Sequence, residues 1–311
     1  MEYAHKPVLL EECIEALDIK PDGIYVDGTL GGGGHSFEIA GKLAENGRLV
    51  CIDRDSRAIE RAGERLKPLI ERITIVHGNF RELGSILDRL EIDKVDGMLF
   101  DLGVSSPQLD EAERGFSYMT DAPLDMRMDE TEGITARNIV NEWPEDKLRR
   151  ILYDFGEERY APRIASAIVR QRRNKAIETT AELVDVIRSA MPAAALREKQ
   201  HPAKRSFQAI RIAVNDELES ISDMLACAAD RLKKGGRLAV ISFHSLEDRI
   251  VKNAISSREK GCTCPRDFPI CTCGFVQTLK SITKKPIISG CEELEENPRA
   301  RSAKLRVAKR V

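Results

Sequence analysis

The sequence predicts an α/β protein with a parallel, doubly wound sheet that is interrupted by an inserted all-helical domain. Three observations support this prediction. Strand-like apolar runs alternate with helix-like segments as far as Asp101, the strand pattern then disappears, and it returns in the last third of the chain. We therefore expect a discontinuous sheet domain formed by residues 1–107 and 205–311, with residues 108–204 inserted as the helical domain.

The first predicted strand, Ile24–Asp27, runs directly into a glycine-rich turn and a helix. A short helix opening near Pro7 is expected before it. Five of the seven residues from Gly28 to Gly34 are glycine, which permits positive φ and lets backbone N–H groups approach a ligand. Strand, turn and helix are typical of the first half of a nucleotide-binding unit. A tight turn without any ligand is the alternative for a glycine run taken alone.

Three more strands are predicted after this turn: 48–53, 73–77 and 94–101. Asp53 lies 20 residues beyond Gly33, where a carboxylate can bind ribose hydroxyls, although a helix N-cap is the alternative. Phe80 follows the third strand, where it could stack on an adenine ring or belong to the core. Ligands of such sheets bind at the carboxyl ends of the strands. The turn, Asp53, Phe80 and Asp101 should therefore converge.

The residues from 108 to 204 show helix patterns only, including Glu145–Phe155, Arg159–Asn174 and a capping box made by Thr179 with Glu182. Apolar residues spaced by three or four from 207 to 232 then predict one long amphipathic helix, ended by Gly235-Gly236. The run 237–242 predicts a fifth strand. Two short runs, 287–288 and 305–307, predict a final hairpin at the sheet edge.

Composition restricts where the protein acts and what it binds. The formal net charge is −2 and the isoelectric point is near 6.3, which argues against a broad basic face but allows local patches. Cations cluster at 170–175, 201–205 and 299–310, and any one such run is more often a solvated surface than an RNA site. Neither a signal peptide nor a membrane-spanning run is evident, so we expect a cytoplasmic protein without a membrane partner.

Two ligands fit the predicted strand, turn and helix: a nicotinamide dinucleotide and S-adenosylmethionine. Asp27 precedes the glycine turn, where its carboxylate would repel a pyrophosphate but could help to hold the cationic amine of a methionine group. The second half of the chain also lacks the full set of units that a nicotinamide pocket requires. S-adenosylmethionine is the favoured cofactor.

The chain resembles the ribosomal small-subunit methyltransferase H family, the cytosine-N4 methyltransferases of 16S ribosomal RNA. The motifs that carry the resemblance span nearly the whole chain: Pro7–Leu10, Asp27–Ser36, Asp101–Asp110, Arg114–Ser117, Pro123–Met128, Gly156–Arg159, Arg205–Ile212, Ser242–Arg249 and Asn297–Ser302. The resemblance implies a class I S-adenosylmethionine-dependent methyltransferase (Rossmann-like) domain with a helical insertion. It implies a cytidine in the decoding region of the RNA as substrate, within the small ribosomal subunit.

The resemblance also implies a set of cofactor-binding residues: Gly33, Gly34, His35, Asp53, Phe80, Asp101 and Gln108. Five of these already stand at predicted strand ends, whereas His35 and Gln108 rest on the resemblance. The expected reaction is displacement at the sulfonium methyl by the exocyclic amine of cytosine, aided by positioning and a hydrogen-bond acceptor. Asp101 and His244 are the candidate catalytic residues, and Asp248 is a further candidate to orient the base. A structural hydrogen bond at a strand end is an equal alternative for His244.

Four cysteines lie close together in the C-terminal part of the chain: Cys262, Cys264, Cys271 and Cys273. They form two Cys-x-Cys pairs, and four thiols can hold a tetrahedral zinc ion. The spacing is not the commoner Cys-x-x-Cys, so a reduced and inert loop is the alternative. A zinc ion here would be structural.

Two other function classes remain at this stage. One is a nicotinamide-dependent oxidoreductase, and the other is a non-catalytic RNA-binding assembly factor that retains only the fold. The sequence also leaves open whether the chain forms a homodimer and which group accepts the proton.

Overall fold

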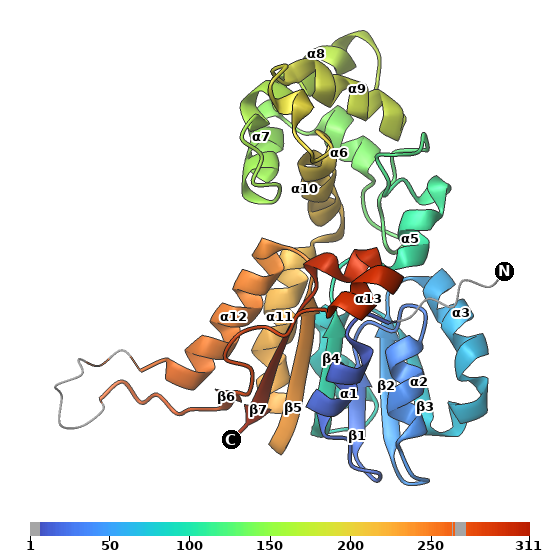
Figure 1. Ribbon diagram of the computed structural model, residues 1–311, viewed down its shortest axis with the longest axis vertical. Helices are drawn as coiled ribbons and strands as arrows, with labels where there is room; N and C mark the ends of the chain where they lie inside the picture. The colour runs from blue at the N-terminus through green and yellow to red at the C-terminus, as the bar shows by residue number, and fades with distance from the viewer. Residues whose placement is uncertain (1–6, 263, 265–271) are drawn as a thin grey trace. The chain divides into compact units, whose positions relative to one another are not determined.

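The computed structural model describes residues 7–262, 264 and 272–311, and we refer to these as the described residues (Figure 1). They fall into two compact units, each considered by itself. Met1–Gly103 with Leu218–Val311 forms the sheet unit, and Val104–Glu217 forms the helical unit. The α/β fold with a helical insertion is therefore confirmed, and the helical unit extends to Glu217 rather than ending at residue 204.

The sheet unit is built on a seven-stranded sheet with the order β3-β2-β1-β4-β5-β7-β6. Its strands are β1 (Ile24–Asp27), β2 (Arg48–Asp53), β3 (Ile73–His77), β4 (Val95–Asp101), β5 (Leu232–Ser242), β6 (Leu279–Ser281) and β7 (Lys304–Arg310). The first five are parallel, β7 is antiparallel to β5, and β6 is antiparallel to β7. The strand order reverses beside β1, so β1 and β4 mark the point where ligands bind in such sheets.

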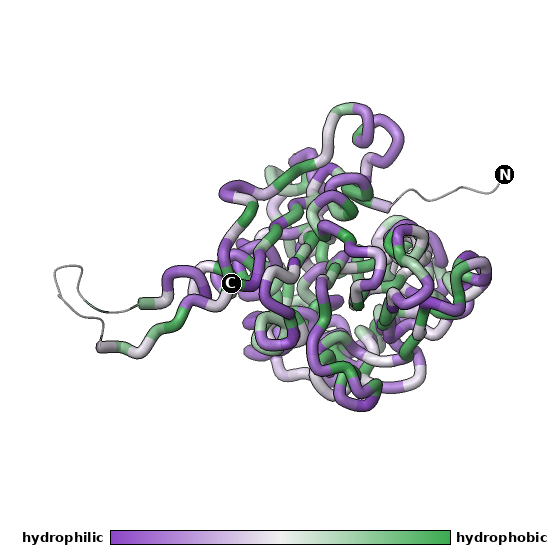
Figure 2. The backbone as a smooth tube through the Cα atoms, turned by 90° about the horizontal axis from the view of Figure 1, so that it is seen from below, coloured by the Kyte–Doolittle hydropathy of each residue, from purple (hydrophilic) through white to green (hydrophobic). Residues whose placement is uncertain are grey.

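Helices cover both faces of this sheet. The helices α1 (Leu10–Leu17), α2 (Gly34–Gly41) and α3 (Ser56–Leu66) pack on one face, and α4 (Leu83–Arg89), α11 (Glu217–Arg231) and α12 (Ser245–Lys260) pack on the other. Side chains alternate between the two faces along each strand, so Tyr25 joins the first core and Val26 the second. Hydrophobic stretches accordingly alternate with hydrophilic ones along the chain (Figure 2).

The helical unit contains α5 (Ser106–Asp110), α6 (Ala136–Glu142), α7 (Glu145–Asp154), α8 (Ala161–Asn174), α9 (Thr180–Ala190) and α10 (Lys204–Asn215). One apolar core joins the helices α6 to α10. The predicted helices 145–155 and 159–174 correspond to α7 and α8. The capping box is confirmed, because the Thr179 Oγ1 accepts from the Glu182 N–H and the Glu182 carboxylate accepts from the Thr179 N–H.

The predicted long helix from 207 to 232 is wrong. It is two helices, α10 and α11, separated by Asp216 in the left-handed conformation at φ 51°. Asp216 ends α10 as its C-cap, and α10 packs against α6 and α7. The apolar spacing continues across the break, which is why it gave no signal. The following strand also begins earlier than expected, at Leu232, because Gly235 and Gly236 lie within β5.

Two smaller expectations also change at the ends of the sheet unit. The first helix begins at Leu10 rather than near Pro7, since Leu9 precedes it at φ 51°. The predicted hairpin is present in another form: β7 pairs mainly with β5 and β6, while Ile287 forms a single bridge with Leu305. Among the described helices, none combines the length and the apolar character needed to span a membrane.

Candidate functional site

The glycine turn connects the carboxyl ends of three neighbouring strands by hydrogen bonds. The Gly31 N–H donates to Asp53 Oδ2 at the end of β2, over 2.7 Å. The Asp101 N–H at the end of β4 donates to Thr29 Oγ1, over 2.6 Å. The turn itself continues from Asp27, the last residue of β1. These bonds hold three carboxylates at the same edge of the sheet, as the sequence predicted for Asp53 and Asp101.

Both carboxylate oxygens of Asp27 accept hydrogen bonds from residues of the turn and of the helix that follows it. Its Oδ2 accepts a hydrogen bond of 2.6 Å from the Ser36 hydroxyl, and its Oδ1 accepts one of 3.1 Å from the Thr29 N–H. The side chain is buried, and burial raises the pKa of Asp27 despite these hydrogen bonds. Thr29 and Ser36 were missed as site residues. A hydroxyl within a glycine turn does not indicate from sequence which strand end it contacts.

Several glycines of the turn are required by packing. A Cβ at Gly34 would lie 2.2 Å from Pro7 Cγ, and a Cβ at Gly28 would lie 2.1 Å from Phe100 Cε1. Gly33 adopts φ 72° as the N-cap of α2, where a side chain would be strained. By contrast, Gly32 is exposed and a Cβ there would meet no atom within 4 Å. The open part of the turn is therefore around Gly32.

His35 is buried at the start of α2, and its two ring nitrogens face the Val8 carbonyl and the Asp101 carboxyl group. Its Nε2 donates to the Val8 carbonyl oxygen over 3.0 Å, because a carbonyl can only accept. Burial lowers the pKa of His35 to about 4, so the ring is neutral near pH 7. The remaining nitrogen, Nδ1, then carries a lone pair and lies 4.0 Å from Asp101 Oδ2.

The charge of the Asp101 carboxylate is not balanced by an ion pair with a lysine or arginine among the described residues. Within the part of the chain that the structure describes, its Oδ1 is buried and has no hydrogen-bond partner. Burial, followed by the charges of Asp27 and Glu247, raises the pKa of Asp101 to about 8. A carboxyl group in this state is ready to receive a cation or a hydrogen-bond donor.

Asp53 lies at the end of β2 with both oxygens engaged by backbone N–H groups, from Gly31 and from Asp55. Burial outweighs these bonds and raises the pKa of Asp53 to about 6. Each carboxylate oxygen can accept a second hydrogen bond. The position therefore suits a ligand that donates hydroxyl groups.

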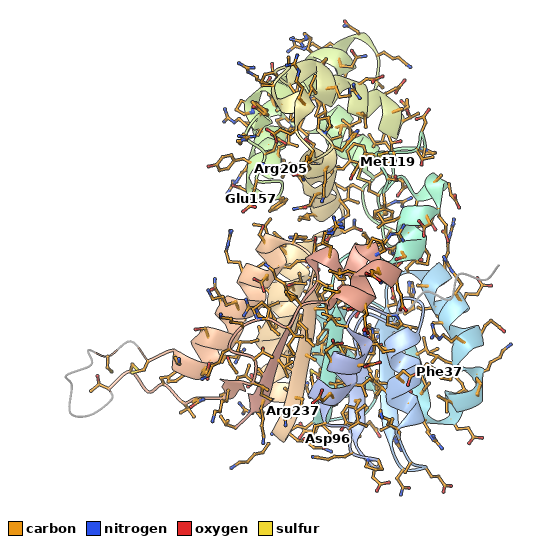
Figure 3. All side chains as sticks on the ribbon, viewed as in Figure 1. Phe37, Asp96, Met119, Glu157, Arg205 and Arg237 are labelled. Atoms are coloured by element: carbon orange, nitrogen blue, oxygen red, sulfur yellow. The ribbon has the colours of Figure 1, made fainter. Side chains whose placement is uncertain are left out.

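The opposite end of β4 provides a comparison, labelled in Figure 3. Asp96 is also buried, but Lys233 Nζ lies 2.7 Å from its Oδ2 and Lys20 Nζ lies 3.1 Å from its Oδ1. Burial would raise the pKa of Asp96, yet the bonds from Lys233, Ile24 N–H and Lys20 lower it overall. Among the described residues, no lysine or arginine forms such an ion pair with Asp27, Asp53 or Asp101. The aspartate at one end of β4 is thus paired with cations, whereas the aspartate at the other end is not.

Two further predicted cofactor residues have defined local roles. Phe80 begins a short 3₁₀ turn after β3 and packs edge to face on Phe100, with ring centroids 6.0 Å apart. It is only partly buried, so one part of its ring remains accessible. Gln108 belongs to the helical unit, where its Oε1 accepts from the Ser105 N–H in the capping box of α5.

His244 and Asp248 have structural partners at the start of α12. His244 is the N-cap of this helix, and its Nε2 lies 3.2 Å from Glu247 Oε1. Asp248 forms a two-point ion pair with Arg306 of β7, at 2.6 and 3.2 Å. Burial would raise the pKa of Asp248, but Arg306 and Lys304 lower it overall. The capping contact matches the structural alternative for His244.

The predicted cysteine cluster is partly described. Cys262, Cys264 and Cys273 lie together, with their sulfur atoms all within 4.8 Å of one another. The fourth, Cys271, lies outside the described residues. Cys262, Cys264 and Cys273 come after α12 in the chain, whereas the three carboxylates end β1, β2 and β4.

Some residues of the three cationic runs form contacts within the protein. Arg172 donates to the carbonyl oxygens of Val140 and Trp143, and Arg306 pairs with Asp248. Arg170, Arg173 and Lys204 are exposed on the helical unit. An RNA partner could therefore contact only part of each run.

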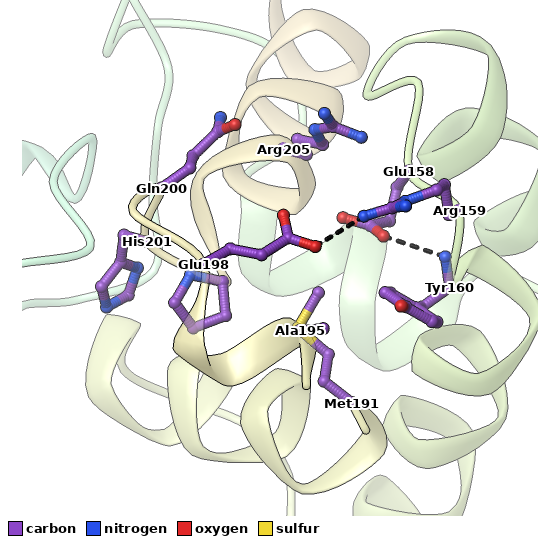
Figure 4. A pocket seen from close by; sticks show the side chains of 10 residues that line it. Glu158, Arg159, Tyr160, Met191, Ala195, Glu198, Gln200, His201 and Arg205 are labelled. Atoms are coloured by element: carbon purple, nitrogen blue, oxygen red, sulfur yellow. Dashed lines mark hydrogen bonds and ion pairs between the residues drawn. The ribbon is translucent and has the colours of Figure 1, made fainter. Parts of the chain in front are cut away.

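A shallow hollow lies within the helical unit next to one of these runs (Figure 4). It is lined by basic, acidic and aromatic groups, among them Arg159, Tyr160, Glu198, His201 and Arg205. Arg159 pairs with Glu198 across the hollow, over 2.7 Å. The ring of His201 stacks on Tyr118 at its edge, with centroids 4.6 Å apart. Flat groups and cations of this kind are suited to nucleobases and phosphates.

Comparison with known proteins gives matches along the whole chain. The model of the MraW methylase family matches residues 2–311. A protein of Heliobacterium mobile named ribosomal RNA small subunit methyltransferase H is 56% identical over 312 residues, covering 100% of this chain and 100% of that protein. A protein of the same name from Brevibacillus brevis is 54% identical over 311 residues, covering 100% and 99% respectively.

Proposed function

The chain belongs to the MraW methylase family, and on that premise we propose that it is an S-adenosylmethionine-dependent methyltransferase of small-subunit ribosomal RNA. The product we propose is N4-methylcytidine in the decoding region of 16S ribosomal RNA. The relatives that share over half of the sequence are named for methylation of this RNA. The small ribosomal subunit is then the expected partner, and the cytoplasm the place of action.

One observation carries the choice of a cationic cofactor. Asp27, Asp53 and Asp101 end the adjacent strands β1, β2 and β4, and burial raises the pKa of each. Among the described residues none of the three forms an ion pair with a lysine or arginine, and the nearby charge of Arg54 only partly offsets the raised pKa of Asp53. A ligand with a sulfonium and an ammonium group would relieve this excess of negative charge. A pyrophosphate would add to it. The residues therefore fit S-adenosylmethionine better than a dinucleotide.

Each predicted contact has a defined chemical task in this proposal. Asp53 would accept hydrogen bonds from ribose hydroxyls, and the accessible part of Phe80 would pack on the adenine. The open turn around Gly32, with Gly33, Gly34 and His35 beneath it, would leave room for the methionine part of the ligand. Gln108 is retained in the proposal as a cofactor contact that the family resemblance implies.

S-adenosylmethionine, when bound, supplies an electrophilic methyl group on a positively charged sulfur. The cytosine amine would displace the sulfur at that methyl carbon, so that an N–C bond would replace the C–S bond and one N–H proton would have to leave. Asp101 is the proposed acceptor of that proton, because it has an unpartnered oxygen and a pKa raised by burial to about 8. His35 beside this carboxyl group stays neutral, because burial lowers its pKa, and so it would not compete with the cofactor as a cation.

His244 holds the start of α12 beside this edge of the sheet and would act by positioning the segment 242–244. RNA contact is proposed for the helical unit, at the hollow that contains Arg159, His201 and Arg205, and at the exposed cations of α8. Basic and flat side chains together are suited to an RNA surface with unstacked bases.

The decisive experiment incubates the protein with radiolabelled S-adenosylmethionine and either assembled small subunits or naked 16S RNA. Digestion to nucleosides and mass spectrometry should identify N4-methylcytidine. Asp101→Asn should lower the rate at least about a hundredfold, whereas Asp230→Asn, at an exposed site on α11, should not change it. Transfer to another atom would contradict the N4 assignment. Absence of transfer to either RNA form would favour a non-catalytic assembly factor, and binding of NAD instead would favour an oxidoreductase.

A further inference from the structure

The described residues that follow α12 and those that precede β6 extend away from the body of the sheet unit in two perpendicular views (Figures 1 and 2), and we call them the two legs of an arm. Its two legs contact each other at matched positions. The Thr278 N–H donates to the Arg258 carbonyl oxygen over 3.1 Å, and a Cβ at Gly261 would lie 2.7 Å from the ring of Phe275. The legs therefore run antiparallel from the body of the unit outward.

The cysteines are the next contacts along these legs. Cys262 on one leg lies 3.6 Å, sulfur to sulfur, from Cys273 on the other. One step further out, Cys264 Sγ accepts a hydrogen bond from the Thr272 N–H over 3.3 Å. The cysteines thus face one another because the antiparallel register places them there.

No buried apolar core holds together the part of the arm that the structure describes. From Gly261 to Thr278, each described residue is exposed or only partly buried. A segment without a core normally needs a disulfide or a metal ion to hold one conformation. The observed sulfur separation of 3.6 Å is much longer than the roughly 2.05 Å of a disulfide bond.

The separation does match a metal site. Sulfur atoms about 2.3 Å from a tetrahedral zinc ion stand about 3.8 Å from one another. The sulfurs of Cys262, Cys264 and Cys273 are all within 4.8 Å of one another, so a small movement would place them on one ion. Metal ions bind thiolates rather than thiols.

We propose that Cys262, Cys264 and Cys273 bind a structural Zn²⁺ ion that fastens the two legs of this arm. Three sulfurs leave one position of a tetrahedral zinc ion for a further ligand. Each thiol releases its proton to solvent as its sulfur binds the ion. The ion has no part in methyl transfer, so this inference goes beyond the proposed function.

The first test measures the zinc content of protein purified without chelators, by elemental mass spectrometry. We expect about one zinc per chain, four-coordinate, as in structural sites. The double variant Cys262→Ser/Cys273→Ser should retain less than about a tenth of that amount. Cys291→Ser removes an exposed cysteine of α13 (Cys291–Glu296) outside the cluster and should retain all of it. Less than half an equivalent in the unchanged protein, or equal zinc in the double variant, overturns the proposal.

The second test replaces the metal and examines the arm directly. Cobalt(II) titrated into metal-free protein should give the intense absorption of tetrahedral thiolate coordination, and the double variant should not. Limited proteolysis should cut the arm at least about tenfold faster after zinc removal, since the fastening of its legs is lost. Methyl transfer should persist in the double variant, so that failure here is distinct from failure of the methyltransferase proposal. Unchanged cleavage after metal removal would refute a structural role.

Discussion

Replacing Asp101 by asparagine should make the cofactor-free protein more stable, although it removes a residue proposed for catalysis. The carboxyl is buried beside Asp27 and Glu247, and burial with these charges raises its pKa from 3.8 to about 8. A carboxyl whose pKa is raised by folding contributes fully to stability only below its unfolded pKa, and that contribution is lost as the pH rises through about 8. The neutral amide of asparagine has no such loss.

The size of the effect follows from the shift. At about 1.36 kcal/mol per unit, a shift of roughly four units corresponds to an upper limit of about 6 kcal/mol above pH 8. The side chain is 26% exposed, so solvent screens part of this. We expect about a third of the limit, which is ~2 kcal/mol at about pH 9 and ~1 kcal/mol at about pH 6.

The assay is urea unfolding of both proteins without cofactor, followed by circular dichroism at the two pH values. Asp230→Asn, at an exposed position of α11, serves as the control and should show little change at either pH. Two results would refute the claim that the ionised Asp101 carboxylate destabilises the cofactor-free protein. Asp101→Asn could be less stable than the unchanged protein at the higher pH, or its stabilising effect could fail to grow with pH.

The remaining predictions concern the cofactor, the turn and the helical unit. Asp53→Ala should weaken binding of S-adenosylmethionine about tenfold or more by calorimetry, and unchanged affinity would contradict its ribose role. Gly28→Ala should lower the free energy of unfolding by about 1–3 kcal/mol, because its Cβ would overlap the ring of Phe100; equal stability in urea would show that the ring can move. Asn215→Ala should cost about 2–4 kcal/mol in the helical unit, because the Met126 carbonyl and the Met128 N–H lose a buried partner. Local hydrogen exchange would measure this loss, and unchanged exchange rates would refute it.

Much of the sheet unit could be predicted because its signals are local. Each parallel strand is a short apolar run, and Asp53 and Asp101 occupy strand ends that the run itself defines. The convergence of these ends then follows from the geometry of parallel sheets. The electrostatic state of Asp101 could not be predicted, because it depends on the absence of a nearby cation in three dimensions. Asp96, in the same strand, has two lysine partners that are distant in sequence.

The break between α10 and α11 was hidden for a related reason. Apolar residues keep helical spacing on both sides of Asp216, so the pattern alone predicts one helix. A left-handed residue ends a helix without changing that spacing. The same applies to β6, whose three residues pair with β7 only because the arm returns to the sheet edge. Such features depend on tertiary contacts rather than on local sequence.

The place of the helical unit in the chain has a consequence for synthesis on the ribosome. β4 and β5 are neighbours in the sheet, yet the whole helical unit lies between them in sequence. Four strands therefore emerge with an unpaired edge at β4, which stays without its partner until the inserted unit has been translated. Early folding of that unit would shorten the effective loop that β4–β5 pairing must close. Slow elongation within the insertion would lengthen the exposure of this edge, and aggregation of the nascent chain would rise accordingly.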